Sequence, residues 1–262
     1  MGTFFINPKL AAGARDEAAL IVHPHAQRTG GNTLRNHILS AALGKERVYC
    51  RTRNGAVKWR KLGDRDVEGF KAVTDHFDFT ANAVTRPLLP VAVLRHPLYR
   101  AVSLYHFVRR KERHREHKLG EAMGLEEFYR TASELNPRYY RNLQCRRICG
   151  VDDARVALER IEARFLAVGF TEHLGEFAGA LGAVMGWPSL VIEAGESDAA
   201  RYEPEITPGF RDAVLKDNAE DLALYETMRA GPPYTLPRRA PAQEARTLLN
   251  RAKGWAKQVL GR

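Results

Sequence analysis

The sequence predicts an α/β domain in which a central parallel sheet is flanked by helices. Three short apolar runs have the length of buried strands, and a stretch with helical periodicity follows each of them. Because strands and helices alternate along the chain, right-handed crossovers would place the strands parallel in one sheet. The chain has 262 residues, and its hydrophobic fraction of 44% excludes wholesale disorder.

The first strand–helix unit contains a glycine turn. Ala18–Val22 is expected to be a strand, and the apolar residues between Leu34 and Leu43 have the spacing of a helix. Glycines let the backbone approach a ligand closely, and a helix start presents free N–H groups to an anion. A purely structural turn would explain the glycines, but not the polar side chains around them. The turn therefore predicts a P-loop-like anion site, formed by Arg28, Thr29, Gly30, Gly31, Asn32 and Thr33.

The second unit supplies groups for another phosphate. Leu88–Leu94 is expected to be a strand and Leu98–Phe107 a helix, with Arg95 between them and Ser103 on the helix. Ligands bind beyond the carboxyl ends of parallel strands, so both side chains are expected to face an anion near the first turn. A surface salt bridge of Arg95 is the alternative.

The remaining helices and the domain division follow from the same patterns. Phe165–Phe170 is predicted to be a third strand, followed by a helix over Glu172–Trp187. Residues 1–230 are expected to form one domain, and residues 231–262 a Pro-rich linker with a basic helix packed on or beside it. A membrane-surface or dimerisation helix is the alternative for this last segment. Further helices are expected over Leu125–Glu134, Tyr140–Cys149 and Thr207–Met228.

The charge of the chain favours an anionic partner. With 41 Lys and Arg against 31 Asp and Glu, the formal net charge is +10. Six of the eleven residues from Val108 to Lys118 are basic. Two interpretations stay open: a solvated helix extension in which Glu112 and Glu116 pair with arginines at i,i+4, or an electropositive rim that recruits an anionic acceptor.

Cysteine usage and hydropathy predict a soluble protein of the cytoplasm. No apolar run approaches the ~20 residues that span a bilayer, and the first residues lack the pattern of a secretory signal. Three cysteines are too few for a disulfide scaffold. Cys145 and Cys149, at i and i+4, are expected to share one helix face in the core, with a redox role as the alternative.

Six segments together resemble the carbohydrate sulfotransferases. Arg28–Leu34 is similar to their 5′-phosphosulfate loop, Lys-Thr-Gly-Gly-Thr-Thr/Ser-Leu. Arg95–Tyr105 resembles their 3′-phosphate motif and has the same Arg-to-Ser spacing. Asp75-His76-Phe77 resembles a segment of the heparan and uronyl 2-O-sulfotransferases. The other three segments, which resemble the family's Asn-x-Gln-x-Arg, Val-Gly-Leu-x-Glu and Asn-x-x-Asp-x-x-Leu-Tyr patterns, are Asn142–Arg146, Val168–Glu172 and Asn218–Tyr225.

The chain departs from the family pattern at three positions. Arg28 replaces the loop lysine, Gln27 replaces a proline, and His96 replaces the aspartate after Arg95. An arginine keeps the positive charge but lacks the compact geometry of a lysine ammonium.

The resemblance implies a fold of the sulfotransferase type and an enzyme dependent on 3′-phosphoadenosine 5′-phosphosulfate (PAPS). The sulfuryl group would pass to a hydroxyl of a carbohydrate or glycoconjugate. An anionic acceptor that bears a hydroxyl is an alternative to a neutral glycan. Arg28 and the backbone from Gly30 to Thr33 would hold the leaving 5′-phosphate, and Arg95 and Ser103 the 3′-phosphate. His76 would be the general base, as its position in the family segment and the near-neutral pKa of an imidazole suggest; a hydrogen-bonded core histidine is the alternative.

Other functions stay open at this point. A basic module that binds nucleotides or polyanions without catalysis is one alternative, and another phosphate-loop enzyme such as a nucleotide kinase is the second, although the Walker Lys-Ser/Thr is missing. Nothing beyond bulk charge favours nucleic acid. His23 and His25 would face the same side of a strand, but no third ligand accompanies them, so no metal is predicted.

Overall fold

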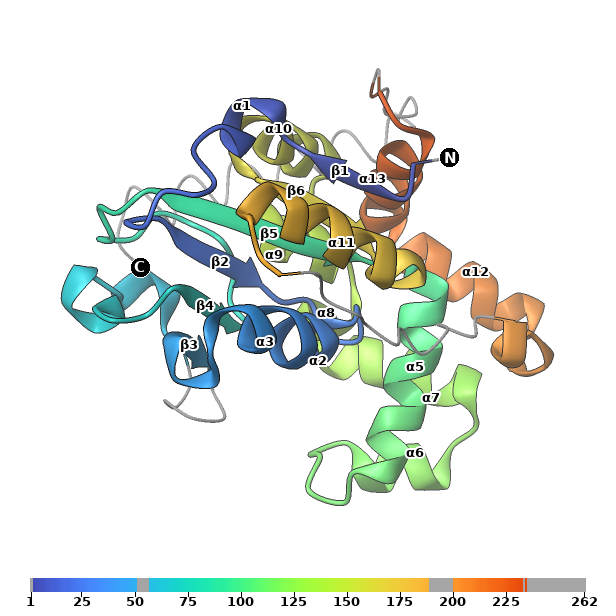
Figure 1. Ribbon diagram of the computed structural model, residues 1–262. Coiled ribbons are helices and arrows are strands. Elements are labelled where there is room, and N and C mark those ends of the chain that lie inside the picture. The colour runs from blue at the N-terminus through green and yellow to red at the C-terminus, as the bar shows by residue number, and fades with distance from the viewer. Residues whose placement is uncertain (1, 51–56, 189–199, 233, 235–262) are drawn as a thin grey trace, which may run out of the picture.

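The computed structural model contains one six-stranded sheet of order β1-β6-β5-β2-β4-β3 (Figure 1). It describes residues 2–50, 57–188, 200–232 and 234. Every strand pairs in parallel with its neighbours except β1, which runs antiparallel to β6. The predicted α/β architecture with a mainly parallel central sheet is confirmed. The strands are β1 (Phe4–Ile6), β2 (Leu20–Pro24), β3 (Val48–Cys50), β4 (Ala72–Asp75), β5 (Leu88–Leu94) and β6 (Ala167–Phe170).

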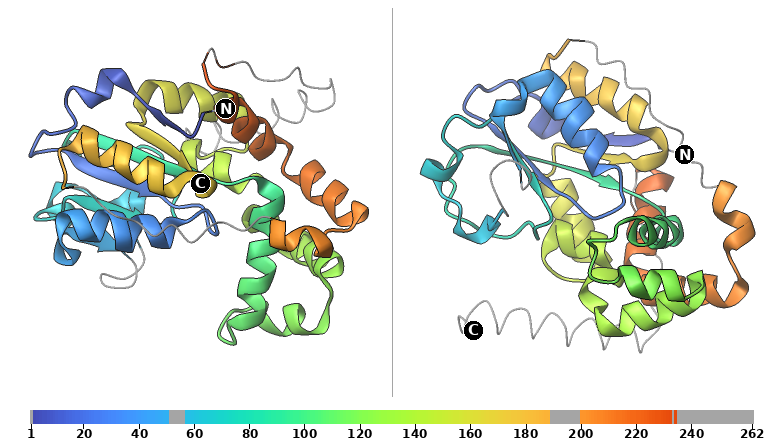
Figure 2. Two further views of the ribbon diagram at one scale, coloured as in Figure 1. Left: turned by 45° about the vertical axis from the view of Figure 1, so that its right-hand side comes forward. Right: turned by 90° about the horizontal axis from the view of Figure 1, so that it is seen from below.

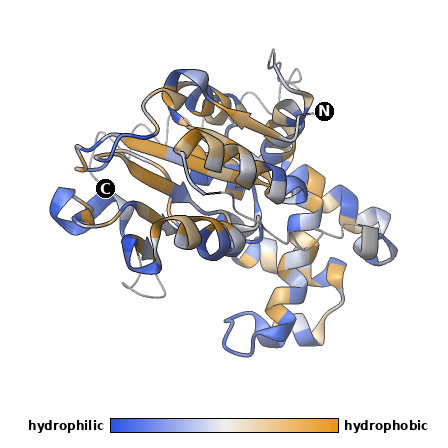
Figure 3. Cartoon of the chain, in the orientation of Figure 1, coloured by the Kyte–Doolittle hydropathy of each residue, from blue (hydrophilic) through white to orange (hydrophobic). Residues whose placement is uncertain are grey.

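The central strands are apolar throughout because the sheet is covered on both faces. Ile21 of β2 and Val91 of β5 pack into one core cluster with the helical segment after β2 and with α11 (Leu174–Met185). Their neighbours Val22 and Ala92 pack into a second cluster with α9 (Leu143–Cys149), α10 (Ala154–Arg164) and α13 (Ala219–Ala230). Figure 1 shows these two helical layers on opposite faces of the sheet, and Figure 3 shows the strands between them as hydrophobic.

The helix after β2 is continuous from residue 31 to residue 43. It consists of α2 (Gly31–Thr33), a π-helical stretch η1 (Leu34–Leu39) and α3 (Ser40–Leu43). Leu34, Ile38 and Leu39 are fully buried, as the predicted helical spacing requires.

A third group of helices lies beyond one end of the sheet. α5 (Pro97–Arg110) leaves the carboxyl end of β5 and packs with α7 (Leu125–Leu135) and α12 (Pro208–Asp217) around Val102, Phe128 and Phe210. Figure 2 shows this group standing apart from the two layers that cover the sheet. The remaining short helices are α1 (Pro8–Ala11), α6 (His117–Ala122) and α8 (Pro137–Tyr140).

Element boundaries differ from the predictions where tertiary pairing decides them. The strand predicted over Ala18–Val22 is displaced to Leu20–Pro24, because parallel pairing with β5 starts at Leu20 and pairing with β4 continues to Pro24. The single helix predicted over Thr207–Met228 is two helices, α12 and α13, separated at Asn218. The strand predicted at Leu88–Leu94 is confirmed without change.

Three short strands and one helix of more than six residues are absent from the sequence predictions. β1, β3 and β4 have only three or four residues each, too few for a recognisable apolar run. β4 matters most, since it ends at Asp75 and therefore places His76 directly at a strand end. The missed helix is α10.

The predicted linker and basic helix of residues 231–262 lie outside the described residues, apart from 231, 232 and 234. The division of the chain at residue 230 therefore stays a prediction. Among the helices that the structure describes, none has the length and apolar character needed to cross a membrane.

Replacing Gly169 by alanine is expected to destabilise the sheet. Gly169 lies in β6, and a Cβ there would stand 2.4 Å from Cγ of Phe177 on α11. Overpacking of this kind costs about 1–3 kcal/mol, measured as the free energy of unfolding in urea. Gly179→Ala on the exposed side of α11 is the matched control, because no atom lies within 4 Å of its Cβ position. Equal stability of G169A and the wild type would contradict the packing described for β6 and α11.

Candidate functional site

The residues predicted to form the site follow the carboxyl ends of three adjacent strands. β2 lies between β4 and β5 and pairs with both in parallel. The glycine turn follows β2, His76 follows β4, and Arg95 follows β5. Parallel pairing therefore places all three segments at the same edge, where α/β sheets bind ligands.

The glycine turn has the backbone needed to start a helix close to a ligand. Gly30 is the N-cap of α2 with a φ of 81°, and Arg28 also has a positive φ of 68°. A Cβ on Gly31 would lie 2.1 Å from the His25 ring, so only glycine allows this packing. Thr29 is buried, and its hydroxyl donates to the Ala26 carbonyl at 2.8 Å; this hydrogen bond stabilises the turn.

The other two polar residues of the turn lie on the first helical turn. Asn32 is exposed, and its Oδ1 accepts a hydrogen bond of 3.2 Å from Arg35. Thr33 is half-buried. Neither side chain contacts Arg28, Arg95 or Ser103 among the hydrogen bonds of the described residues.

Arg28, Arg95 and Ser103 are in direct contact. Nε of Arg28 donates to Oγ of Ser103 at 3.1 Å, and Nη1 of Arg95 donates to the Arg28 carbonyl at 3.2 Å. The Arg28 guanidinium also lies 4.9 Å from the ring centroid of Phe107, a cation–π contact. Burial is the main cause that lowers the pKa of both arginines. Among the described residues, neither guanidinium forms an ion pair with a carboxylate.

Arg95 keeps an unpaired donor in a buried position. Its side chain is 7% exposed, and its Nε has no hydrogen-bond partner among the described residues. Leaving a buried donor unsatisfied costs about 1–3 kcal/mol, more for a charged group. A guanidinium held in this way, beside a second one and a hydroxyl, has the donor set that binds a phosphate or sulfate group.

His76 lies next to His25 with a defined tautomer. Nδ1 of His76 is 3.1 Å from the His25 carbonyl, and the His76 amide donates to Asp75 at 2.8 Å. Because a carbonyl can only accept, this contact places the proton of the neutral ring on Nδ1 and a lone pair on Nε2. The side chain is exposed at the strand edge. This geometry suits a proton acceptor and differs from that of a core histidine.

The rings of His23, His25 and His76 contact one another in series, from buried His23 to exposed His76 at this edge. The ring centroids of His23 and His25 are 5.2 Å apart, and those of His25 and His76 are 4.6 Å apart. Burial lowers the pKa of His23 to about 3, and burial together with the charge of His76 lowers the pKa of His25 well below its ordinary value. In the described part of the chain, no three His, Cys, Asp or Glu side chains are grouped as metal ligands would be.

His96 caps the helix that directly follows Arg95. It is the N-cap of α5, and its Nδ1 accepts a hydrogen bond of 3.3 Å from the Leu98 amide. The cap therefore needs a neutral imidazole, and burial lowers the pKa of His96 to about 4. This cap fixes the start of α5, which directly follows Arg95.

The cysteines occupy the core, as predicted. Cys145 and Cys149 are buried on one face of α9, and the Cys149 thiol lies 3.1 Å from the Cys145 carbonyl. Burial raises the pKa of Cys145 well above its ordinary value and that of Cys149 to about 12. Burial of this kind is typical of structural cysteines.

The basic segment lies at the far end of α5 and in the turn that follows. The expected i,i+4 pairs are wrong: Arg115 pairs with the adjacent Glu116 at 3.3 Å, and Glu112 forms no ion pair among the described residues. The segment begins beside the site, since Phe107, whose ring contacts the Arg28 guanidinium, directly precedes Val108. Figure 3 shows the turn after α5 as strongly hydrophilic.

An open pocket of about 500 Å³ lies at the opposite end of the sheet. Ala18, Lys71 and Arg86, which line it, precede β2, β4 and β5. Arg86 donates to four carbonyls there, and Lys71 pairs with Glu17 at 2.7 Å. Two of its cations thus have structural partners, and none of the predicted site residues lines this pocket.

Two features of the site were missed by sequence reasoning. Gln144 bonds both main-chain groups of Arg95, although only its place in a motif was noted. Phe107 supports Arg28 from one helical turn beyond Ser103. The i+4 spacing of Ser103 and Phe107 on a predicted helix is the signal that could have found the second contact.

No protein-family model matches this sequence, and no curated protein matches it.

Replacing His96 by asparagine is expected to make stability less dependent on pH. Below pH ~6.5 the unfolded chain binds a proton at His96 that the folded cap excludes down to about pH 4. Stability from this group is complete above pH ~6.5 and falls as the pH drops toward 4. Asparagine can cap a helix without titrating.

The measurement is the free energy of unfolding of H96N and the wild type from pH 7 to pH 4. The variant should lose less stability across this range. His37→Asn, at an exposed position on the helix after β2, serves as the control. Parallel curves for H96N and the wild type would show that His96 does not cap α5 as a neutral ring.

Proposed function

We propose that this protein is a PAPS-dependent sulfotransferase of the carbohydrate type, with the sulfotransferase variant of the α/β fold. The observation that carries the proposal is the contact of Arg28 with Ser103 and Arg95 beside a glycine turn at a helix start. PAPS has two anionic ends, a phosphosulfate on the 5′ carbon and a phosphate on the 3′ carbon. A site for it needs two sets of donors close together.

The donors available match that need. The unpaired Nε of Arg95 and the hydroxyl of Ser103 would hold the 3′-phosphate, a group that distinguishes PAPS from ordinary adenine nucleotides. The backbone N–H groups from Gly30 to Thr33, at the positive end of the helix, would hold the 5′-phosphate. The main chain of Arg28 belongs to the glycine turn, while its Nε contacts Ser103; its side chain would turn from Ser103 toward the 5′-phosphate to neutralise charge on the leaving group.

His76 would take the proton of the acceptor. As the acceptor oxygen forms its bond to sulfur, the hydroxyl proton passes to Nε2 of His76, and the bond between sulfur and the 5′-phosphate oxygen breaks. The electron pair stays on that oxygen, and the charge of the product 3′-phosphoadenosine 5′-phosphate meets Arg28 and the helix start. The His25 carbonyl keeps the ring oriented by accepting from Nδ1. No covalent intermediate is needed.

One observation favours a second candidate, a nucleotide-binding module without catalysis. The Arg28 guanidinium is anchored on α5 by Ser103 and Phe107. If it stays there with ligand bound, it serves the 3′-phosphate and leaves the transferred group without a cation. Transfer of radiolabelled sulfate from PAPS to a panel of glycans, glycolipids and small alcohols separates the two candidates.

The protein is expected to bind 3′-phosphoadenosine 5′-phosphate at least tenfold more tightly than adenosine 5′-phosphate. The physical reason is the extra phosphate, because one charge-assisted hydrogen bond contributes about 1.5–3 kcal/mol. Titration calorimetry of both nucleotides measures the difference, with Ser103→Ala reducing it. Equal affinities would remove Arg95 and Ser103 from the proposed site.

His76→Ala is expected to leave nucleotide affinity unchanged and to lower the transfer rate by roughly 10²–10⁴, the usual contribution of a general base. The wild type should lose activity toward acidic pH as His76 is protonated, and the variant should lack this limb. His37→Ala is the control for loss of an exposed histidine. Wild-type turnover per folded molecule in H76A would show that another group accepts the proton.

A further inference from the structure

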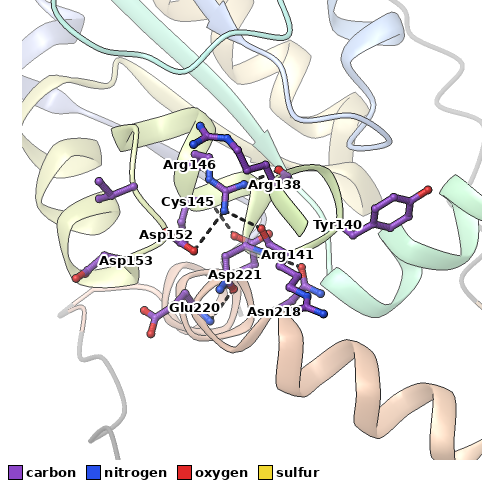
Figure 4. Close-up of polar contacts among 12 residues, drawn as sticks. Arg138, Tyr140, Arg141, Cys145, Arg146, Asp152, Asp153, Asn218, Glu220 and Asp221 are labelled. Carbon is purple, nitrogen blue, oxygen red and sulfur yellow. Dashed lines mark hydrogen bonds and ion pairs between the residues drawn. The ribbon is translucent and has the colours of Figure 1, made fainter. Parts of the chain in front are cut away.

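Two helix starts that are distant in sequence cap each other in the core. Asp221 of α13 accepts hydrogen bonds from the amides of Gln144 and Cys145 at 3.0 and 2.8 Å, so its carboxylate caps α9. In return, Oδ1 of Asn142 accepts from the amides of Glu220 and Asp221 at 3.1 and 3.2 Å and caps α13. Figure 4 shows Asp221 pointing from α13 toward the start of α9, where Cys145 lies.

This arrangement is buried and closed by a further contact. Asp221 is 1% exposed and Asn218 is fully buried. Oδ1 of Asn218 accepts from the Asn142 amide at 3.1 Å, and Asn142 itself has the left-handed φ of 44°. The start of α9 is therefore held in one position relative to α13 by the buried side chains of Asp221 and Asn218 and by the half-buried side chain of Asn142.

Gln144 extends this connection to the candidate site. Its side chain is 1% exposed; its Oε1 accepts from the Arg95 amide at 2.8 Å, and its Nε2 donates to the Arg95 carbonyl at 2.9 Å. Arg95 directly follows β5, where the ladder with β6 has ended at Leu94. Gln144 thus replaces a neighbouring strand for both main-chain groups of Arg95.

We propose that Gln144 is a positioning residue for the Arg95 guanidinium and that Asp221 holds Gln144 in place, so that α13 sets the geometry of the 3′-phosphate contact. The inference rests on the proposed function, because it concerns the group that would bind this phosphate. The Arg95 side chain has no ion pair among the described residues and donates only to the Arg28 carbonyl. The orientation of the Arg95 guanidinium therefore depends on the position of the main chain at residue 95.

The test compares nucleotide affinities in Gln144→Met. Methionine is close to glutamine in shape and removes both hydrogen bonds to Arg95. The expected result is about tenfold weaker binding of 3′-phosphoadenosine 5′-phosphate in titration calorimetry, which corresponds to about 1.4 kcal/mol. Affinity for adenosine 5′-phosphate, which has no 3′-phosphate, should stay unchanged. A merely structural role would lower the folded fraction and leave the ratio of the two affinities as it is.

Two further variants keep the result decisive. Asp221→Asn keeps one acceptor for the two amides that start α9. It should lower the ratio of the two nucleotide affinities less than Q144M does. It can be measured even if Q144M folds too poorly. Cys149→Ala removes a buried side chain from the same helix without touching Gln144 or Arg95, and should lower the melting temperature while the ratio stays at the wild-type value.

The failures of this inference and of the proposed function give different results. If the wild type discriminates between the two nucleotides and Q144M and D221N discriminate equally well, Gln144 does not position Arg95. If the wild type binds neither nucleotide, the proposed function is wrong and this inference is wrong with it.

Discussion

The parallel pairing of β2 with both β4 and β5 is the constraint on which the candidate site depends. A parallel neighbour on each side brings three strand ends to one edge, and each end carries one component: the glycine turn, His76 or Arg95. Parallel strands also need crossover connections, and the helices that make them bury both faces of the sheet. The same arrangement therefore produces the core and the site.

Burying the positive charge of the site lowers the stability of the folded protein. Two guanidinium groups, Arg28 and Arg95, are taken partly out of water near a helix start that is itself positive. Burial opposes their charged forms, and no carboxylate among the described residues compensates by an ion pair. An arrangement that stability alone does not favour is typical of a ligand site, where an anion supplies the missing interaction.

Support for these cations comes from neutral groups. Ser103 and Phe107 on α5 hold Arg28, and the Gln144 amide holds the main chain of Arg95. A carboxylate in place of Ser103 would pair with the Arg28 guanidinium and compete with a phosphate. Neutral hydrogen bonds and an aromatic face fix the position of a cation without reducing its charge.

The sequence by itself determined the fold class, the glycine turn and the choice of Arg28, Arg95 and Ser103. These are local properties: an apolar run such as Leu88–Leu94 must be buried whatever surrounds it, and glycines beside donors predict an anion turn in any fold. The tertiary structure decided what depends on partners distant in the chain. β4 has too few residues to be recognised without the β2 and β3 ladders, so the position of His76 at a strand end could not be predicted. Asn218 divides α12 from α13 because it bonds Asn142, 76 residues away, and nothing in the local pattern records that contact. The direction of Arg28 toward Ser103 likewise follows from the packing of α5, since the local sequence specifies the charge of a side chain but not the neighbour that it reaches.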